Sequence, residues 1–200
     1  MVSSRVLLSF TVILVVVGAA AYSVGGQWGS PKPAAFTTTS TTTLTATTSV
    51  EGPNDLVQYC FSPGGNCDQI LVSWINRANS SVHVLIYEFT LSDVSQALIA
   101  AQKRGVDVKV VMERENVNDT SSQFYYLKNS GINIRWDTNS ALMHDKVTVI
   151  DGHVILTGSF NYTVSASNAN NENLVVINST SWGAAFEQNF QQVWSTAASP

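Results

Sequence analysis

Four polar side chains flank two aliphatic runs in the segment 143–161. His144 and Lys146 precede the first run, and Ser159 and Asn161 follow the second. Each of these residues taken alone has an ordinary structural explanation. Together, an imidazole, an ammonium group, a hydroxyl and an amide offer charge neutralisation and directed hydrogen bonds, which is what a tetrahedral anion requires.

The two aliphatic runs flank Asp151-Gly152, which predicts a β-hairpin with a two-residue turn, because type I′ turns need positive φ at both central positions. In this register His144 faces Ser159. Because successive side chains alternate between the faces of a strand, His144, Lys146 and Ser159 are expected on one face, with the asparagine two residues further on. Asp151 lies about 16 Å from Lys146 along the strand and is interpreted as a turn residue.

The wider pattern resembles the HKD signature of the phospholipase D superfamily, in particular its short members with a single motif, such as the bacterial periplasmic endonuclease and the mitochondrial cardiolipin hydrolases. The similarity covers about residues 57–195. The segments that carry it are His144-x-Lys146-x4-Asp151, Gly158-Ser159-x-Asn161, Asn171-Glu172-Asn173, Phe61-Ser-Pro-Gly-Gly, Tyr87-Glu-Phe-Thr90 and Arg104-Gly-Val-Asp-Val-Lys-Val.

The resemblance implies that His144 is a nucleophile that forms a phosphohistidine. It implies that Lys146, Ser159 and Asn161 bind the phosphoryl oxygens, and that Glu172 hydrogen-bonds the second ring nitrogen of the nucleophile. Gly152 and Gly158 belong to the structural part of the motif, with Asp151. No cofactor and no metal ion is expected, because Lys146 and its counterpart in a second copy supply the positive charge that a metal would otherwise give.

A leaving oxygen must be protonated while His144 attacks, and one imidazole cannot perform both tasks. His153 lies beside the turn, about 20 Å from the open end of the hairpin, and His83 lies within an apolar strand. We therefore expect the acid to be His144 of a second copy, in a two-fold homodimer whose motifs line one cleft. The resemblance implies the same arrangement.

The surrounding patterns predict an α/β layered sandwich with a mixed sheet flanked by helices. A β-α-β unit is expected from strand 82–87, helix 90–104 with Ser92 as its N-cap, and strand 106–112. A helix at 121–128, a strand at 132–136 and a closing helix at 179–194 follow. The closing helix is expected to bury one face, formed by Trp182, Phe186, Phe190 and Val193/Trp194.

Residues 1–29 contain one cation, an apolar run from Val6 to Val17 and then small residues, which indicates an export signal that is either cleaved or retained as a membrane anchor. Residues 30–50 form a Thr- and Pro-rich linker, either a glycosylated stalk or a plain spacer. The catalytic domain is expected at residues 51–200, outside the cytoplasm. All 14 acidic residues lie from Glu51 onward. Because non-specific binding to nucleic acid depends on a basic surface, this charge argues mildly against a protein that coats DNA without sequence preference.

Cys60 and Cys67 bracket a Pro- and Gly-containing turn, which favours a local disulfide in an exported protein. The three histidines show no grouping typical of a zinc site, and the cysteines that hold zinc in some relatives are missing.

The function expected from the sequence is an exported endonuclease that hydrolyses phosphodiesters without metal. The alternative substrate is a phospholipid head group, which the acidic body and a retained anchor would favour. An alternative of another class is a stalked surface-binding protein that has lost catalysis. The four Asn-x-Ser/Thr sequons permit that alternative: Asn79, Asn118, Asn161 and Asn178.

Overall fold

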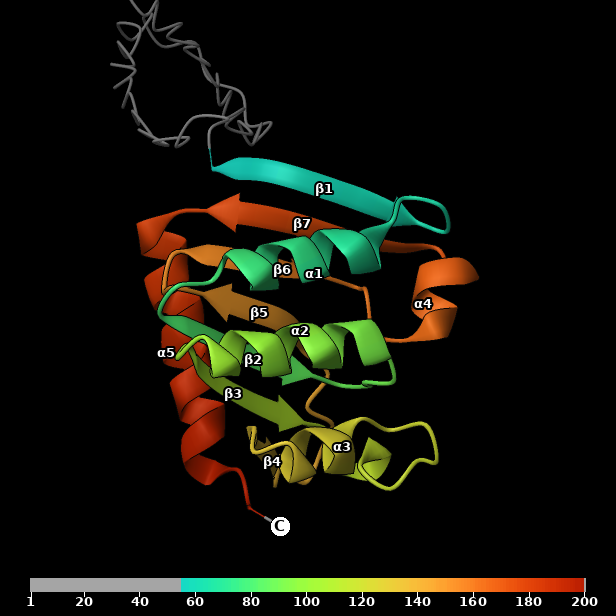
Figure 1. The fold of residues 1–200 in the computed structure, drawn as a ribbon, viewed down its shortest axis with the longest axis vertical. Helices are drawn as coiled ribbons and strands as arrows, with labels where there is room; N and C mark the ends of the chain where they lie inside the picture. The colour runs from blue at the N-terminus through green and yellow to red at the C-terminus, as the bar shows by residue number, and fades with distance from the viewer. Residues whose placement is uncertain (1–54, 200) are drawn as a thin grey trace, which may run out of the picture. The chain divides into compact units, whose positions relative to one another are not determined.

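The computed structural model describes residues 55–199, which form one seven-stranded mixed sheet with helices on both faces (Figure 1). The expected α/β layered sandwich is therefore confirmed. The sheet order is β1-β7-β6-β5-β2-β3-β4. The elements are β1 (Leu56–Ser62), α1 (Cys67–Arg77), β2 (Ser81–Ile86), α2 (Ser92–Lys103), β3 (Asp107–Met112), the 3-10 turn η1 (Arg114–Asn116), α3 (Phe124–Asn129), β4 (Asn133–Trp136), β5 (Lys146–Ile150), β6 (Val154–Gly158), α4 (Val164–Asn168), β7 (Glu172–Asn178) and α5 (Thr180–Thr196). The expected signal segment and linker, residues 1–29 and 30–50, lie outside the described residues.

Strands β2, β3 and β4 form the parallel half of the sheet, and α2 connects the first two of them. Strand β2 is apolar along almost its whole length because it is covered on both faces: Val84 packs toward α1 and α2, and Leu85 packs toward α5. Helix α2 begins at Ser92, but its N-cap is Leu91, and the Ser92 hydroxyl contacts the neighbouring Asp93 instead of capping a backbone N–H. The expected Ser92 cap was therefore wrong.

The hairpin of β5 and β6 has the expected turn residues but a different register. Asp151 and Gly152 both have positive φ, at 52° and 70°. However, Ile150 pairs with Val154, so His153 is an extra residue in the connection. The expected pairing of His144 with Ser159 was wrong by one residue, because continuing the observed register places Lys146 opposite Gly158.

Packing of α5 against the turn accounts for this extra residue. The backbone carbonyl of His153 accepts a hydrogen bond from the N–H of Ser179 at 2.8 Å. Gly183 lies so close to the turn that an added Cβ would meet the carbonyl oxygen of Gly152 at 2.2 Å. Because Gly183 faces the turn, Trp182 is 52% exposed and is not part of the buried face expected for this helix, whereas Phe190 is buried.

The side chain of Asp151 connects the hairpin turn to the start of β2. Its carboxylate accepts hydrogen bonds from the backbone N–H groups of Asn79, Ser80 and Ser81 and from the Ser80 hydroxyl. Partial burial opposes ionisation, but these donors outweigh it and lower the pKa of Asp151 to about 2. The structure thus places Asp151 in a turn, as the sequence predicted.

We expect Asp151→Asn to lower the free energy of unfolding by about 1–2 kcal/mol at pH 7, allowing for solvent screening. Because the folded-state pKa is depressed, this stability is fully present above about pH 4 and is lost as the pH falls toward 2. Urea denaturation at pH 7 and at pH 3 tests this prediction, with Asp68→Asn on α1 as the control. An equal cost at both pH values would contradict it.

The edge strand β1 pairs with β7 and leads into α1 through a short turn. Cys60 on β1 and Cys67 at the start of α1 form a disulfide, with their Cα atoms 5.6 Å apart. The cysteines belong to the core between the sheet and helices α1 and α2. The disulfide therefore holds α1 against β1. The neighbour of β1 in the sheet is β7, which begins at Glu172.

Candidate active site

His144 and Lys146 lie at the edge of the sheet where β2 and β3 end, because Lys146 begins β5 and pairs with Ile86 at the end of β2. The ring of Tyr87, just after β2, contacts both of them. Its centroid is 4.5 Å from that of the His144 ring and 4.9 Å from the Lys146 Nζ atom. His144 is exposed, whereas Lys146 is only 7% exposed. The site therefore presents an exposed imidazole and a nearly buried ammonium group against the same ring.

Lys146 is held by its surroundings in one orientation. Its Nζ donates a hydrogen bond to the backbone carbonyl of His144 at 2.9 Å, and the Tyr87 ring adds a cation–π contact. Burial lowers the pKa of Lys146 below the ordinary lysine value of 10.5, and the nearby carboxylates of Asp145, Glu172 and Glu88 oppose that shift only in part. A weakly hydrated cation of this kind attracts an anion strongly.

Ser159 and Glu172 are brought together where β6 ends and β7 begins. The Ser159 hydroxyl donates a hydrogen bond to the Glu172 carboxylate and accepts one from the N–H of Asn173 at 3.1 Å. The second carboxylate oxygen of Glu172 accepts a hydrogen bond from Asn170 at 3.1 Å. In the described part of the chain, no hydrogen bond joins Glu172 to the His144 ring, so its orienting role toward that ring stays a prediction.

Gly158 permits this close approach of β6 and β7. Its φ is 155°, and an added Cβ would lie 2.2 Å from the carbonyl oxygen of Asn173. That carbonyl accepts hydrogen bonds from the N–H groups of Ser159 and Phe160. Ser159 thus reaches the site through its attachment to β7, and not by direct pairing with the strand of His144.

Asn161 carries a buried polar atom that has no partner. Its Oδ1 is one of two side-chain polar atoms among the described residues that are buried without a hydrogen bond. The next residue, Tyr162, is buried and its hydroxyl lies 2.6 Å from that of Thr148 on β5, which fixes this segment against the sheet. An amide with unused hydrogen-bonding capacity can bind a polar ligand.

The other two histidines lie elsewhere. The His83 ring is buried against Phe190 and lies 2.8 Å from the Glu187 carboxylate on α5. His153 is exposed in the hairpin turn, where its Nδ1 lies 2.8 Å from the carbonyl oxygen of Asp151. Neither histidine is near His144, as the sequence analysis expected.

Tyr87 and Glu113 are site residues to which the sequence analysis assigned no role. Tyr87 follows β2 and Glu113 follows β3, and the C-terminal ends of neighbouring parallel strands meet at one edge of a sheet. That rule could have drawn attention to both residues. Tyr87 contacts the His144 ring, and the Glu113 carboxylate accepts a hydrogen bond from the N–H of Met143. These contacts depend on the fold and could not be inferred from spacing.

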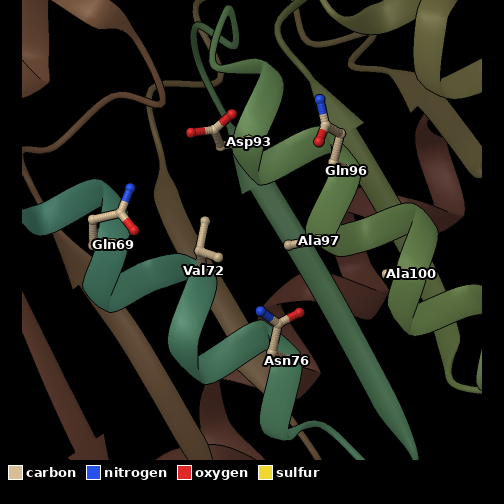
Figure 2. Close-up of a pocket in the computed structure, with 7 residues that line it drawn as sticks. All are labelled: Gln69, Val72, Asn76, Asp93, Gln96, Ala97 and Ala100. Carbon is tan, nitrogen blue, oxygen red and sulfur yellow. The ribbon is translucent and has the colours of Figure 1, made fainter.

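A second feature of the surface lies away from this edge. Figure 2 shows a groove between α1 and α2, to which Gln69, Val72 and Asn76 contribute from α1 and Asp93 and Gln96 from α2. The groove has no histidine, cysteine or cation, so it lacks the groups for nucleophilic or phosphate chemistry. Within residues 55–199, no cluster of three His, Cys, Asp or Glu residues could hold a metal ion.

None of the helices in residues 55–199 is both long and apolar enough to cross a membrane.

Comparison with known proteins places this geometry in a family. Residues 71–194 match the model of the cardiolipin synthase, PLD-like domain. The chain is 36% identical over 134 residues to a phospholipase D of Rickettsia prowazekii, covering 67% of this chain and 65% of that protein. It is 33% identical to the mitochondrial cardiolipin hydrolase of Xenopus tropicalis, covering 69% of this chain and 67% of that protein. The chain thus spans about two thirds of the length of these relatives.

A solved structure has the same fold. The phospholipase D family member Nuc from Salmonella typhimurium superposes with a TM-score of 0.68 at 38% identity, covering 70% of this chain and 95% of that one.

Proposed function

The chain belongs to the phospholipase D superfamily, and we propose that it hydrolyses phosphodiester bonds through a covalent intermediate on His144. One observation carries this proposal: an exposed imidazole and a nearly buried ammonium group lie against one tyrosine ring. Ser159 and Asn161 follow the end of β6 and Glu172 begins β7, at the same edge of the sheet. The imidazole supplies the nucleophile and Lys146 stabilises the negative charge of the phosphoryl oxygens. The Asn161 NH2 group donates a hydrogen bond to the same oxygens, and so does the Ser159 hydroxyl once it turns from Glu172 to the substrate.

The reaction takes place in two displacements. A ring nitrogen of His144 attacks phosphorus, a P–N bond forms, and the P–O bond to the leaving alkoxide breaks while an imidazolium donates a proton to that oxygen. Water then attacks phosphorus, the P–N bond breaks, and the proton of the water passes to the second imidazole, which restores both groups. In this proposal no metal ion takes part.

We further propose that the second imidazole is His144 of another copy in a two-fold homodimer. His83 is bonded to Glu187, and His153 lies in the distant turn, so neither can reach the leaving oxygen. His144 itself is exposed, as an approach by a partner requires. Analytical ultracentrifugation combined with assays over a dilution series tests this proposal, since activity per chain should fall as the dimer dissociates. An active monomer would contradict it.

Nucleic acid is the proposed substrate, with export from the cytoplasm. Two Lys146 ammonium groups facing one cleft would focus a positive field on a phosphate despite the acidic body.

The second candidate is a phospholipid head group, which one specific observation favours. Tyr59 and Phe61 on β1 are 61% and 64% exposed, and Phe61 pairs with Asn173, whose neighbour Glu172 belongs to the site. Exposed aromatic side chains beside a phosphodiester site suit an apolar substrate tail.

An assay with three substrates separates these candidates. The full chain is incubated with single-stranded DNA, duplex DNA and cardiolipin vesicles, each with and without EDTA. Cleavage of DNA and not of cardiolipin supports the nuclease proposal, and the reverse result supports the phospholipase. Activity that disappears with EDTA would overturn the proposal that the reaction needs no metal.

The imidazolium acid loses its proton first as the pH rises, and beyond that decline we expect an alkaline limit of the remaining activity that is set by Lys146. The protonated amine is the active form, and burial lowers its pKa, so kcat/KM should decline at a pH below the ordinary lysine value of 10.5. A pH profile of kcat/KM on bis(4-nitrophenyl) phosphate measures the limit. Lys146→Arg should remove this decline from whatever activity it keeps, because arginine stays charged. An unchanged alkaline limit in that variant would assign the decline to another group.

A further inference from the structure

Glu113 is a buried carboxylate that the proposed reaction does not use. It directly follows β3 and is 4% exposed. Its two oxygens accept backbone hydrogen bonds, from the N–H of Met143 at 2.7 Å and from the N–H of Glu115 at 3.2 Å. It forms none of the salt bridges found within residues 55–199. Since burying a charge is costly unless its hydrogen bonds are made, these two N–H groups are what stabilises the carboxylate.

The first of these hydrogen bonds lies next to the nucleophile. Met143 immediately precedes His144, and its own side chain is buried in the core on the α5 face. On the other side of His144, the carbonyl of Asp145 accepts a hydrogen bond from the N–H of Tyr87 at 3.1 Å. The backbone is therefore tied on both sides of His144 to residues that follow the parallel strands β2 and β3.

The carboxylate itself is carried on a rigid support. The N–H of Glu113 donates to the carbonyl of Ile86 at 3.0 Å, which continues the pairing of β2 with β3. A displacement of the Glu113 side chain would therefore move the Met143–His144 segment relative to the sheet, while Tyr87 would keep its place. The distance between the His144 ring and the Tyr87–Lys146 pair would change.

We propose that Glu113 is a positioning residue, which holds the backbone at Met143 and thereby fixes the attack direction of the His144 imidazole. This inference rests on the proposed function, because it assigns a task within the same site. Both oxygens are needed. A glutamine offers one acceptor oxygen and an NH2 group, so one of the two backbone N–H groups would face a donor and lose its partner. A shift of about 1 Å in a reacting group can cost about 10²-fold in rate.

The test compares Glu113→Gln with Glu115→Gln in the full chain. Glu115 is two residues away and exposed, so the control removes a charge from the same turn without changing the contact to Met143. Two quantities are measured: amide hydrogen exchange of the segment 138–146, and kcat and KM on bis(4-nitrophenyl) phosphate. We expect Glu113→Gln to speed exchange at Met143 at least tenfold and to lower kcat about 10²-fold, with KM within about threefold of the unmodified chain. The control should change neither quantity.

Glu113→Asp provides a second variant if the glutamine does not fold. It keeps the charge but is shorter, so it should speed exchange at Met143 and lower kcat in the same direction, by smaller factors. Unchanged exchange at Met143 in a folded variant would overturn the inference, and so would a raised KM with unchanged kcat. If the unmodified chain hydrolyses no phosphodiester, the proposed function fails, and the exchange measurement still decides whether Glu113 anchors the segment.

Discussion

His144→Ala is expected to lower phosphodiester hydrolysis by a factor of about 10⁴ or more. In the proposed dimer the substitution removes the nucleophile of one copy and the acid of the other, and either loss alone is expected to cost several orders of magnitude. The fold should be retained, because the His144 side chain is exposed and, among the aromatic rings of residues 55–199, its ring contacts only that of Tyr87. The free energy of unfolding should therefore change by less than about 0.5 kcal/mol.

The matched control is His153→Ala, which removes an exposed histidine from the turn at the other end of the hairpin and should keep full activity. Turnover of bis(4-nitrophenyl) phosphate gives the rate. The P–N bond of a phosphohistidine is labile in acid and stable in base. A phosphoryl label with these properties on the denatured protein therefore reports the intermediate, and it should be absent from His144→Ala. A His144→Ala chain that turns over at the normal rate would show that His144 is not the nucleophile, whereas absence of turnover in the unmodified chain would favour the surface-binding protein without catalysis.

The parallel half of the sheet could be predicted from the sequence because its pattern is local. Strand β2 is an uninterrupted apolar run, and α2 is an amphipathic helix closed by Lys103-Arg104-Gly105, so their types and bounds follow within one or two residues. The turn residues Asp151 and Gly152 were also predictable, since few residue types tolerate positive φ. The disulfide agrees with the spacing of its cysteines.

The register of the hairpin could not be predicted, because a distant element decides it. The Asp-Gly pair favours a two-residue connection, but the hydrogen bond from Ser179 at the start of α5 holds the carbonyl of the extra residue, His153. Glu172 is a similar case, since its contact with Ser159 arises from pairing between β6 and β7. Motif spacing identified these side chains, and only tertiary packing determines which of them touch.

Lys146→Met is expected to lower kcat/KM by about 10³-fold without destabilising the protein. The methionine keeps a side chain of similar length but removes the charge that stabilises the phosphoryl oxygens in the transition state. Stability should respond differently. Lys146 is 7% exposed, burial lowers its pKa, and replacing a desolvated charge with an apolar group of similar volume is often neutral or stabilising. We expect the free energy of unfolding to stay the same or to rise by about 1 kcal/mol.

Measuring both quantities on one sample separates chemistry from folding. Urea denaturation gives the free energy of unfolding, and bis(4-nitrophenyl) phosphate gives kcat/KM. Lys128→Met, on the exposed side of α3, is the control and should change neither quantity by a measurable amount. A large loss of stability in Lys146→Met would mean that the hydrogen bond from Nζ to the His144 carbonyl and the contact with Tyr87 outweigh desolvation. A loss of activity below tenfold would show that the phosphoryl charge is stabilised by other groups, and the assignment of Lys146 would then be wrong.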